Sequence, residues 1–257
     1  MSIKSKQVNF SVNGKKILED ISISLNSGEL LSLVGPNGSG KSTFLKILSG
    51  DLKPTAGDIF YNDIEINNIS ILNRAKMRSV MTQSPQIVYD FTAREIIEMG
   101  WISKGDSHKS NLFDGALNKI IKICDLREFI DRKFNFLSGG EKRRVHFART
   151  LIQIWNDNLQ NDPSFMFLDE PTSNLDLYHE LKLLKILKNE SKKGKGILLI
   201  IHNLNLAFKF SDKIGIFKNG KLLSFGEPKE VFTNEILFDV FKIPIKVNSK
   251  NSTLNIY

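Results

Sequence analysis

Gly35-Pro36-Asn37-Gly38-Ser39-Gly40-Lys41-Ser42 is the most informative segment for the expected fold of this chain. It follows the apolar run Leu30 to Val34, which is typical of a buried strand, and precedes a helical pattern from about Lys41 to Ser49 that Gly50 would end. This spacing between a strand and a helix predicts a phosphate-binding loop. Backbone N–H groups would surround a phosphate, Lys41 would reach the β and γ phosphates, and Ser42 would bind Mg²⁺. A glycine-rich turn that only caps a helix has no need of the Gly-Lys-Ser ending.

A second apolar run, Phe165 to Leu168, ends in the two acids Asp169 and Glu170. Carboxylates at the end of a buried strand are costly unless a cation neutralises them. With the phosphate loop upstream, we expect Asp169 to hold Mg²⁺ through water and Glu170 to polarise the attacking water as general base. Considered alone, the two acids would fit a solvated turn.

Leu137-Ser138-Gly139-Gly140-Glu141 precedes a further helical stretch. Ser138 and Glu141 have the spacing of a capping box, which explains the serine and the glutamate but not the two glycines. Glycines at a helix N-terminus let a phosphate approach bare N–H groups. The segment is therefore a candidate second phosphate contact.

The spacing of apolar residues predicts one α/β domain. Alternation at Ile21, Ile23 and Leu25 indicates an N-terminal antiparallel sheet. Buried strands at 165–168 and 197–201, separated by a helical pattern from about Leu177 to Lys192, indicate a mostly parallel core sheet. Together with the phosphate loop, these elements predict an α/β fold class: a phosphate-loop ATPase core with a mostly parallel sheet and an N-terminal antiparallel β subdomain.

A helical subdomain interrupts this core. From about Asp90 the spacing becomes helical, and Thr92 and Glu95 form a capping box at its start. Asn219-Gly220 between apolar runs predicts a β-hairpin after the core returns. We expect residues 1–89 and 160–235 to form the core with its antiparallel region, 90–159 the inserted helical subdomain, and 236–257 a short tail.

Composition limits the function classes. The chain has 257 residues, of which 41% are hydrophobic and 25% charged, as in globular proteins. The longest apolar runs are far short of the roughly 18 to 20 residues that span a bilayer, and no secretory signal is visible at the start. We expect a cytoplasmic protein in which the single cysteine, Cys124, is an inert core thiol rather than a reactive one.

The net charge of +8 raises the possibility of a nucleic-acid partner. However, the lysines and arginines are scattered, and the densest clusters, Lys142-Arg143-Arg144 and Lys192-Lys193 with Lys195, are short and lack interleaved aromatics. We expect these clusters to lie on a solvated surface and expect no nucleic acid among the partners.

Taken together, these motifs resemble those of the ATP-binding cassette ATPases, and the resemblance covers nearly the whole chain. Each family motif has a counterpart in order: Walker A at Gly35 to Ser42, the Q-loop glutamine at Gln83, the family signature at Leu137 to Glu141, Walker B at Phe165 to Asp169 followed by Glu170, the D-loop at Ser173-Asn174-Leu175-Asp176, and the switch histidine at His202. The signature discriminates this family from other phosphate-loop ATPases.

The resemblance implies a homodimer arranged head to tail that sandwiches two ATP molecules. Each ATP would contact Walker A and Thr43 of one subunit, and Ser138, Gly139 and Gly140 of the other, with Asp176 also at the nucleotide. Gln83 would meet Mg²⁺ or the attacking water and couple the site to a transmembrane partner. His202 would contact the γ-phosphate, whereas a lone histidine after a buried strand would fit an ordinary surface position.

The chain departs from the family pattern at a few positions. Asn203 follows the histidine where Asp is usual, and Asn174 replaces the commoner Ala of the D-loop. For the aromatic residue that stacks on adenine, Phe10 is the nearest candidate, while Val12 is the alternative at the matching place. We therefore expect weak base stacking.

Among the importers, the resemblance is nearest to the group that takes up ferric siderophores, vitamin B12 and haem, because little of the chain follows Phe232. The runs Ala148 to Trp155, Asn156 to Ser164, Asp169 to His179 and Ile201 to Ala207 are similar to haem-importing ATPases. They imply a peripheral ATPase on the cytoplasmic face of a bacterial inner membrane, docked to two copies of a permease and served indirectly by a periplasmic binding protein. Siderophore or vitamin B12 import is the alternative, and a soluble cassette ATPase acting on ribosomes or DNA is a third reading.

Overall fold

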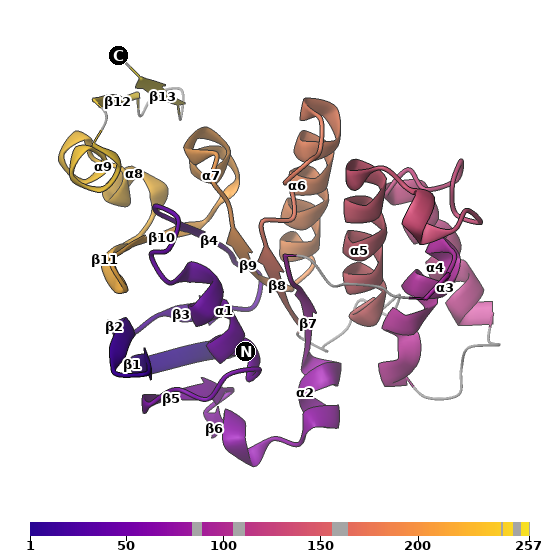
Figure 1. The fold of residues 1–257 in the computed structure, drawn as a ribbon, viewed down its shortest axis with the longest axis horizontal. Helices are drawn as coiled ribbons and strands as arrows, with labels where there is room; N and C mark the ends of the chain where they lie inside the picture. Colours follow the sequence, from indigo (N-terminus) through magenta and orange to yellow (C-terminus); the bar gives the residue numbers. More distant parts are fainter. Residues whose placement is uncertain (84–88, 105–110, 156–163, 243, 249–252, 257) are drawn as a thin grey trace.

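A six-stranded sheet forms the centre of the computed structural model, which describes residues 1–83, 89–104, 111–155, 164–242, 244–248 and 253–256 (Figure 1). Neighbouring strands in this sheet run parallel, except that the edge strand β11 is antiparallel to β10. The order across the sheet is β11 (Lys221–Gly226), β10 (Lys213–Lys218), β4 (Leu30–Val34), β9 (Gly196–Ile200), β8 (Phe165–Asp169) and β7 (Arg78–Met81). The mostly parallel core sheet predicted from the apolar runs is confirmed.

Both faces of this sheet are buried, which is why its central strands are apolar without interruption. Along β8, Phe165 and Phe167 belong to one hydrophobic cluster, whereas Met166 and Leu168 belong to the other. Alternate residues of a strand point to opposite faces, so each strand contributes to both clusters. The two clusters fix the sheet between two layers.

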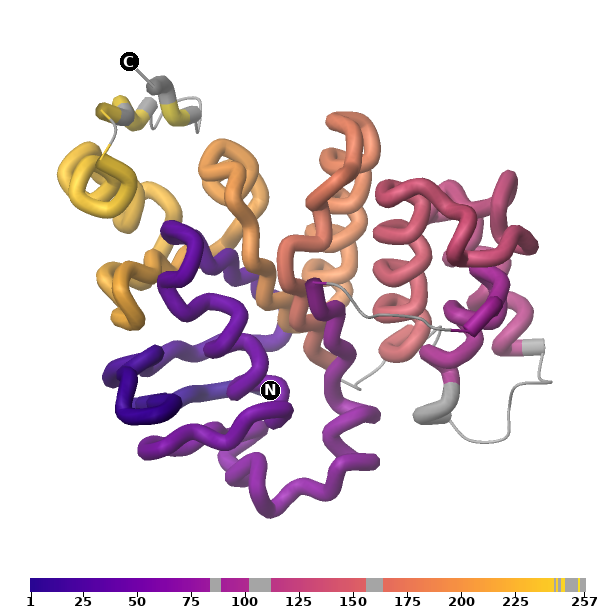
Figure 2. Tube along the Cα trace, in the orientation of Figure 1, coloured from indigo at the N-terminus to yellow at the C-terminus, as the bar shows by residue number. Residues whose placement is uncertain are grey.

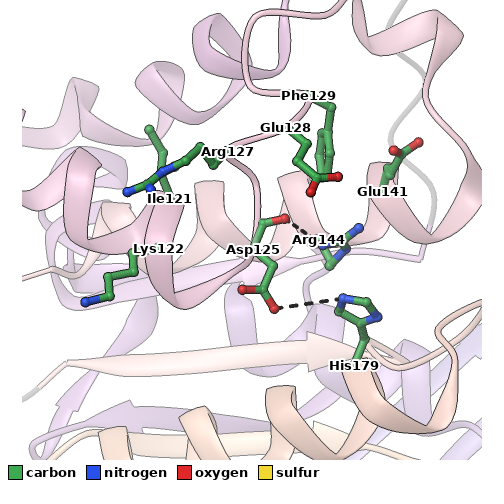
Figure 3. Close-up of a pocket in the computed structure, with 9 residues that line it drawn as sticks. All are labelled: Ile121, Lys122, Asp125, Arg127, Glu128, Phe129, Glu141, Arg144 and His179. Carbon is green, nitrogen blue, oxygen red and sulfur yellow. Dashed lines mark hydrogen bonds and ion pairs between the residues drawn. The ribbon is translucent and has the colours of Figure 1, made fainter.

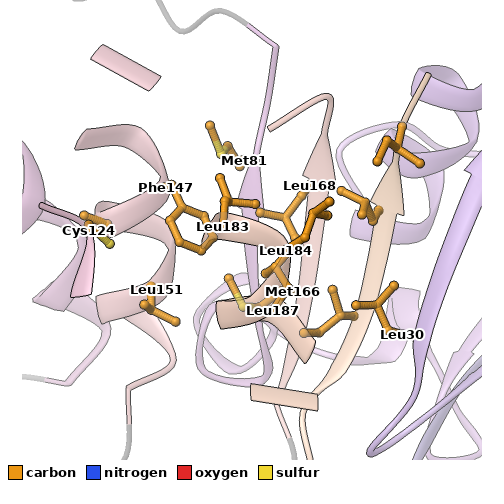
Figure 4. Packing of buried hydrophobic residues seen from close by; sticks show 14 of the residues in the cluster. Leu30, Met81, Cys124, Phe147, Leu151, Met166, Leu168, Leu183, Leu184 and Leu187 are labelled. Atoms are coloured by element: carbon orange, nitrogen blue, oxygen red, sulfur yellow. The ribbon is translucent and has the colours of Figure 1, made fainter. Parts of the chain in front are cut away.

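The larger cluster lies between the sheet and the helices beyond it (Figure 4). It contains Leu183 and Leu187 of α6 (Leu177–Lys192), and Phe147 of α5 (Gly139–Gln153). Cys124 is buried in the same cluster, and burial raises the pKa of its thiol to about 12. The expectation of an inert core thiol is thereby supported.

The smaller cluster holds the N-terminal antiparallel sheet against the other face of the core. The sheet contains β1 (Ser2–Val12), β2 (Lys15–Ile21), β3 (Ser24–Asn26), β5 (Ala56–Tyr61) and β6 (Ile64–Glu65), in the order β2-β1-β5-β6, with β3 paired to β1. The antiparallel β subdomain predicted from the sequence is confirmed.

The alternation at Ile21, Ile23 and Leu25 buries all three side chains, but it spans two strands rather than one. Ile23 lies between β2 and β3, and its backbone N–H donates a hydrogen bond of 2.8 Å to the hydroxyl of Ser5 in β1. A side chain thus replaces a ladder bond where β1 passes from pairing with β2 to pairing with β3.

Helix α1 (Lys41–Ser49) begins directly after the glycine-rich loop and has the predicted bounds. Phe44, Leu45, Ile47 and Leu48 are buried in the smaller cluster, where each contributes about 1.5 to 3 kcal/mol of transfer free energy. Gly50 ends the helix at φ +78°, a left-handed conformation that glycine adopts without strain. The helix therefore fixes the loop against the sheet.

A group of helices lies on the far side of the larger cluster, opposite the antiparallel sheet (Figures 1 and 2). Both predicted capping boxes are present, Thr92 with Glu95 and Ser138 with Glu141. Residues 156–163 of the predicted polar insertion lie outside the described residues. The group comprises α3 (Ala93–Glu98), 3₁₀ turns at Met99–Lys104 and Phe134–Phe136, α4 (Asn111–Ile123) and α5, while α2 (Ile71–Met77) and a 3₁₀ turn at Ile66–Asn68 lead from the antiparallel sheet to β7.

The C-terminal segment completes the core. Leu237 and Val240 of α9 (Asn234–Phe241) are buried. The side-chain amide of Asn205 donates to the backbone carbonyl of Leu254 at 3.2 Å and accepts from its N–H at 2.6 Å. Residues predicted as a tail thus contribute to the packing. The elements are α7 (Leu204–Phe210), α8 (Pro228–Val231), α9 (Asn234–Phe241), β12 (Ile245–Asn248) and β13 (Thr253–Ile256). Within the described residues, no helix combines the length and apolar character needed to cross a membrane.

Two basic residues predicted on a solvated surface are buried instead. Lys195 is 8% exposed and pairs with the buried carboxylate of Glu190. Arg143 is 6% exposed and reaches toward the end of β8. The surface prediction is wrong for both residues, because each finds internal acceptors that repay the burial of its charge.

Candidate nucleotide site

The glycine-rich loop packs closely against the end of strand β10. Gly35 has φ +142°, and a Cβ at this position would lie 2.1 Å from the carbonyl oxygen of Phe217 in β10. Gly40 has φ +102°, a backbone conformation that other residues rarely adopt, and a Cβ there would lie 3.2 Å from the carbonyl oxygen of Ile17 in β2. Only glycine fits at these two places, so the backbone itself forms the surface of the loop.

Lys41 folds back over this loop. Its Nζ donates hydrogen bonds of 2.8 and 2.9 Å to the carbonyl oxygens of Gly35 and Pro36. Burial lowers the pKa of Lys41, while the negative charges of Glu170 and Asp169 oppose that effect. The ammonium group is therefore held at the loop by neutral carbonyls, which a negatively charged phosphate could replace as its partners.

The side chains of Ser42 in α1 and Asp169 at the end of β8 lie within hydrogen-bonding distance of each other. The hydroxyl of Ser42 donates a hydrogen bond of 3.1 Å to Oδ1 of Asp169. Burial raises the pKa of Asp169, and the hydrogen bond from Ser42 opposes that shift. A hydroxyl beside a carboxylate is a set of hard oxygen donors that fits Mg²⁺, which is usually bound by one or two protein oxygens together with phosphates and water.

Glu170 lies at the centre of the predicted catalytic residues. Its Oε1 is 2.6 Å from Nε2 of His202. Burial alone would raise the pKa of Glu170, but hydrogen bonds with His202 and Gln83 and the charge of Lys41 outweigh it and lower the pKa. Glu170 is thus an ionised carboxylate at neutral pH, as a general base must be.

A cavity of about 480 Å³ opens above the loop and brings most of the predicted site residues together. Ile17 of β2 contributes an apolar side chain to it, whereas Phe10 and Val12 do not line it. Neither candidate for stacking on adenine thus borders this cavity, whereas Ile17 does, and no motif of the sequence points to Ile17. The lining residues are Ile17, Asn37, Gly38, Ser39, Gly40, Lys41, Ser42, Thr43, Gln83, Glu170 and His202.

The signature residues lie outside this cavity. Ser138 caps α5, and a Cβ on Gly140 would lie 3.0 Å from the carbonyl oxygen of Asn174 in the same chain. Asp176 caps α6 by accepting a hydrogen bond of 2.8 Å from the backbone N–H of His179. The signature glycines thus pack beside Asn174, and none of Ser138, Gly139, Gly140 and Asp176 lines the cavity above the phosphate loop of their own chain.

The two departures from the family pattern have local explanations. Asn174 has φ +62°, a left-handed conformation that Asn tolerates better than Ala. The side-chain oxygen of Asn203 accepts a hydrogen bond of 3.2 Å from the backbone N–H of Leu206 and so caps α7, as Asp would.

A second cavity, of about 510 Å³, lies between the helical group and the start of α6 (Figure 3). Arg144 donates to the backbone carbonyl of Asp125 at 2.7 Å, and Nε2 of His179 lies 3.9 Å from the carboxylate of Asp125. Its lining mixes acids and bases, including Glu128 and Arg127, and contains no glycine-rich loop that could surround a phosphate.

A parallel sheet, a glycine-rich loop entering a helix, and paired acids beside that loop define a phosphate-loop ATPase. A profile of the ABC transporter family matches residues 18–173, and the chain therefore belongs to that family.

Curated relatives extend the match over most of the chain. The hemin import ATP-binding protein HmuV of Rhodopseudomonas palustris (strain HaA2) is 35% identical over 246 residues, which cover 96% of this chain and 92% of the relative. The protein of the same name from Escherichia coli O157:H7 is 33% identical, over 95% and 94% of the two chains. A solved dimeric ATP-binding cassette in a post-hydrolysis state, bound to ADP and phosphate, superposes with a TM-score of 0.77 at 27% identity and covers 88% of this chain and 98% of its own.

Proposed function

We propose that the chain is the ATP-hydrolysing subunit of a bacterial importer and that haem is its cargo. The observation that carries the ATPase part is the convergence of Lys41, Ser42, Glu170 and His202 on one cavity above the phosphate loop. The proposal that haem is the cargo is based on relatives named for hemin import, which are 35% and 33% identical to this chain over nearly its full length.

In this function the loop from Gly35 to Thr43 binds the phosphates of ATP through its backbone N–H groups and the start of α1. Ser42 and Asp169 would hold Mg²⁺, with Gln83 beside them, and the bound ion would supply positive charge against the phosphates. Ile17 supplies an apolar contact at the rim of the cavity, which supports weak rather than aromatic recognition of the base.

Glu170 accepts a proton from the attacking water. Its lowered pKa and its contact of 2.6 Å with His202 support this role. His202 orients the carboxylate in the free subunit and contacts the γ-phosphate when ATP is present. Because Gln83 also hydrogen bonds with Glu170, a movement at Gln83 changes the position of the base.

The working unit is a homodimer docked to two copies of a permease on the cytoplasmic face of the inner membrane. Ser138, Gly139 and Gly140 complete the partner's nucleotide site, with Asp176 near the interface. None of these residues lines the cavity above the phosphate loop of its own chain, which supports this arrangement, as does the dimeric state of the solved ATP-binding cassette. A periplasmic binding protein delivers the cargo from the other side.

Selective stimulation by haem is the expected result when the subunit is assembled with its permease in lipid. ATP hydrolysis should rise several-fold with the haem-loaded binding protein, because cargo docking favours the closed nucleotide dimer. The binding protein loaded with vitamin B12 or ferric siderophore serves as the matched control. Stimulation by either control ligand alone would contradict haem as cargo but keep the ATPase assignment, and no response in an intact complex would contradict the importer assignment.

A further inference from the structure

Arg143 joins three segments that meet at the nucleotide site. It lies on α5, the helix that Ser138 caps, yet its guanidinium reaches out of the helical group. One terminal nitrogen donates a hydrogen bond of 2.6 Å to the carbonyl oxygen of Gln83. The other donates to the carbonyl oxygen of Asp169 at 3.0 Å and also to that of Glu170.

The two contacts at the end of β8 lie on either side of Glu170, a residue with a strained backbone conformation. Glu170 has φ +49°, a left-handed conformation that is unfavourable for a residue with a long side chain. The carbonyls of Asp169 and Glu170 lie on either side of the φ and ψ angles of Glu170, so a single nitrogen that binds both restricts those angles. The direction of the Glu170 side chain depends on the same two angles.

The guanidinium is suited to this place. Arg143 is 6% exposed, and its charge is balanced by three carbonyl dipoles and by the nearby carboxylates of Asp169 and Glu170. A planar group with five donors can serve three acceptors in fixed directions, which an ammonium or an amide cannot reproduce. Its burial removes the competition of water for those acceptors.

We infer that Arg143 is a positioning residue, which fixes the backbone of Glu170 for general-base chemistry and ties it to α5 and to Gln83. The inference rests on the proposed function of Glu170. Since Ser138 at the start of α5 serves the partner's nucleotide, any movement of α5 also reaches the base of its own subunit. Arg143 thus links the two nucleotide sites of the dimer.

Steady-state ATP hydrolysis of Arg143→Gln and Arg143→Lys tests this role. We expect kcat to fall about 10-fold or more in Arg143→Gln, with KM for ATP changed less than about threefold, because the phosphate loop is untouched. Arg143→Lys keeps the charge and some of the contacts, so its kcat should be intermediate. Arg74→Gln is the matched control, because Arg74 also donates to a backbone carbonyl, that of Gly50 at 3.2 Å, and should leave kcat unchanged.

A purely structural role predicts a different pattern. If both Arg143 variants lose kcat and ATP affinity in proportion, or if Arg143→Gln keeps full turnover, the inference is overturned. Amide hydrogen exchange adds a direct readout, since the turn after β8 should exchange faster in Arg143→Gln than in the wild type at equal ATP occupancy. Unchanged exchange there would also contradict the inference.

Combining Arg143→Gln with Glu170→Gln separates the inference from the function on which it rests. If Arg143 acts through Glu170, adding Arg143→Gln should change the residual turnover of Glu170→Gln less than twofold, because residues that act as a unit are not additive. A further loss of about 10-fold would overturn the inference. Full activity of Glu170→Gln alone would instead overturn the proposed role of Glu170.

Discussion

Turnover of ATP should fall by about 10²- to 10⁴-fold when Glu170 is replaced by Gln, while ATP binding remains intact. Glutamine keeps the size of the side chain and a hydrogen-bond acceptor for Nε2 of His202, which lies 2.6 Å from Oε1 in the wild type. It cannot accept a proton from the attacking water. The substitution therefore removes the base without disturbing the loop that holds the phosphates.

Phosphate release and bound nucleotide should be measured on the same preparation of Glu170→Gln. The matched control is Glu235→Gln, at the exposed first turn of α9, which should keep both quantities at the wild-type level. Wild-type phosphate release by Glu170→Gln would show that Glu170 is not the base and that another group activates the water.

Replacing Lys41 with Ala should weaken ATP binding by about 10- to 100-fold, since hydrogen bonds to charged groups contribute about 1.5 to 3 kcal/mol. The ammonium group lies within 2.9 Å of the loop carbonyls of Gly35 and Pro36 and can transfer to the phosphates without a large movement. Turnover at saturating ATP should also fall, because the charge of Lys41 helps to stabilise the transferring phosphoryl group.

Titration of Lys41→Ala with ATP and Mg²⁺, followed by calorimetry, gives the change in affinity. Lys46→Ala is the matched control, because Lys46 is an exposed lysine in the last turn of the same helix and does not line the cavity. Wild-type affinity in Lys41→Ala would show that the glycine-rich loop is not the phosphate site.

Helices and strands whose sequence signals lie within a few residues of one another could be predicted from the sequence. Helix α1 follows a glycine loop and stops at Gly50, and helix α6 follows the cap of Asp176, so the signals for both lie within a few residues of the ends. The buried strand β8 could be predicted because its run is apolar on both faces. The phosphate loop and the acids at the end of β8 were found by the same local patterns.

The parts that depend on contacts distant in the chain could not be predicted. Arg143 belongs by sequence to a basic cluster, and only the meeting of α5 with Gln83 and with the end of β8 shows that it is buried. The division of the first alternating stretch into β2 and β3 depends on Ser5 of β1. Ile17 lines the cavity because of how β2 lies beside the loop, which spacing alone does not indicate.

We propose that ATP hydrolysis at this cavity drives haem across a membrane. Proteoliposomes that contain the subunit with its permease, ATP beside the subunit and a haem-loaded binding protein on the opposite face test it directly. Haem should cross toward the ATP side with wild-type protein and ATP, and transport should stop with Glu170→Gln or without ATP. Equal haem transport by Glu170→Gln, or transport that does not need ATP, would contradict it.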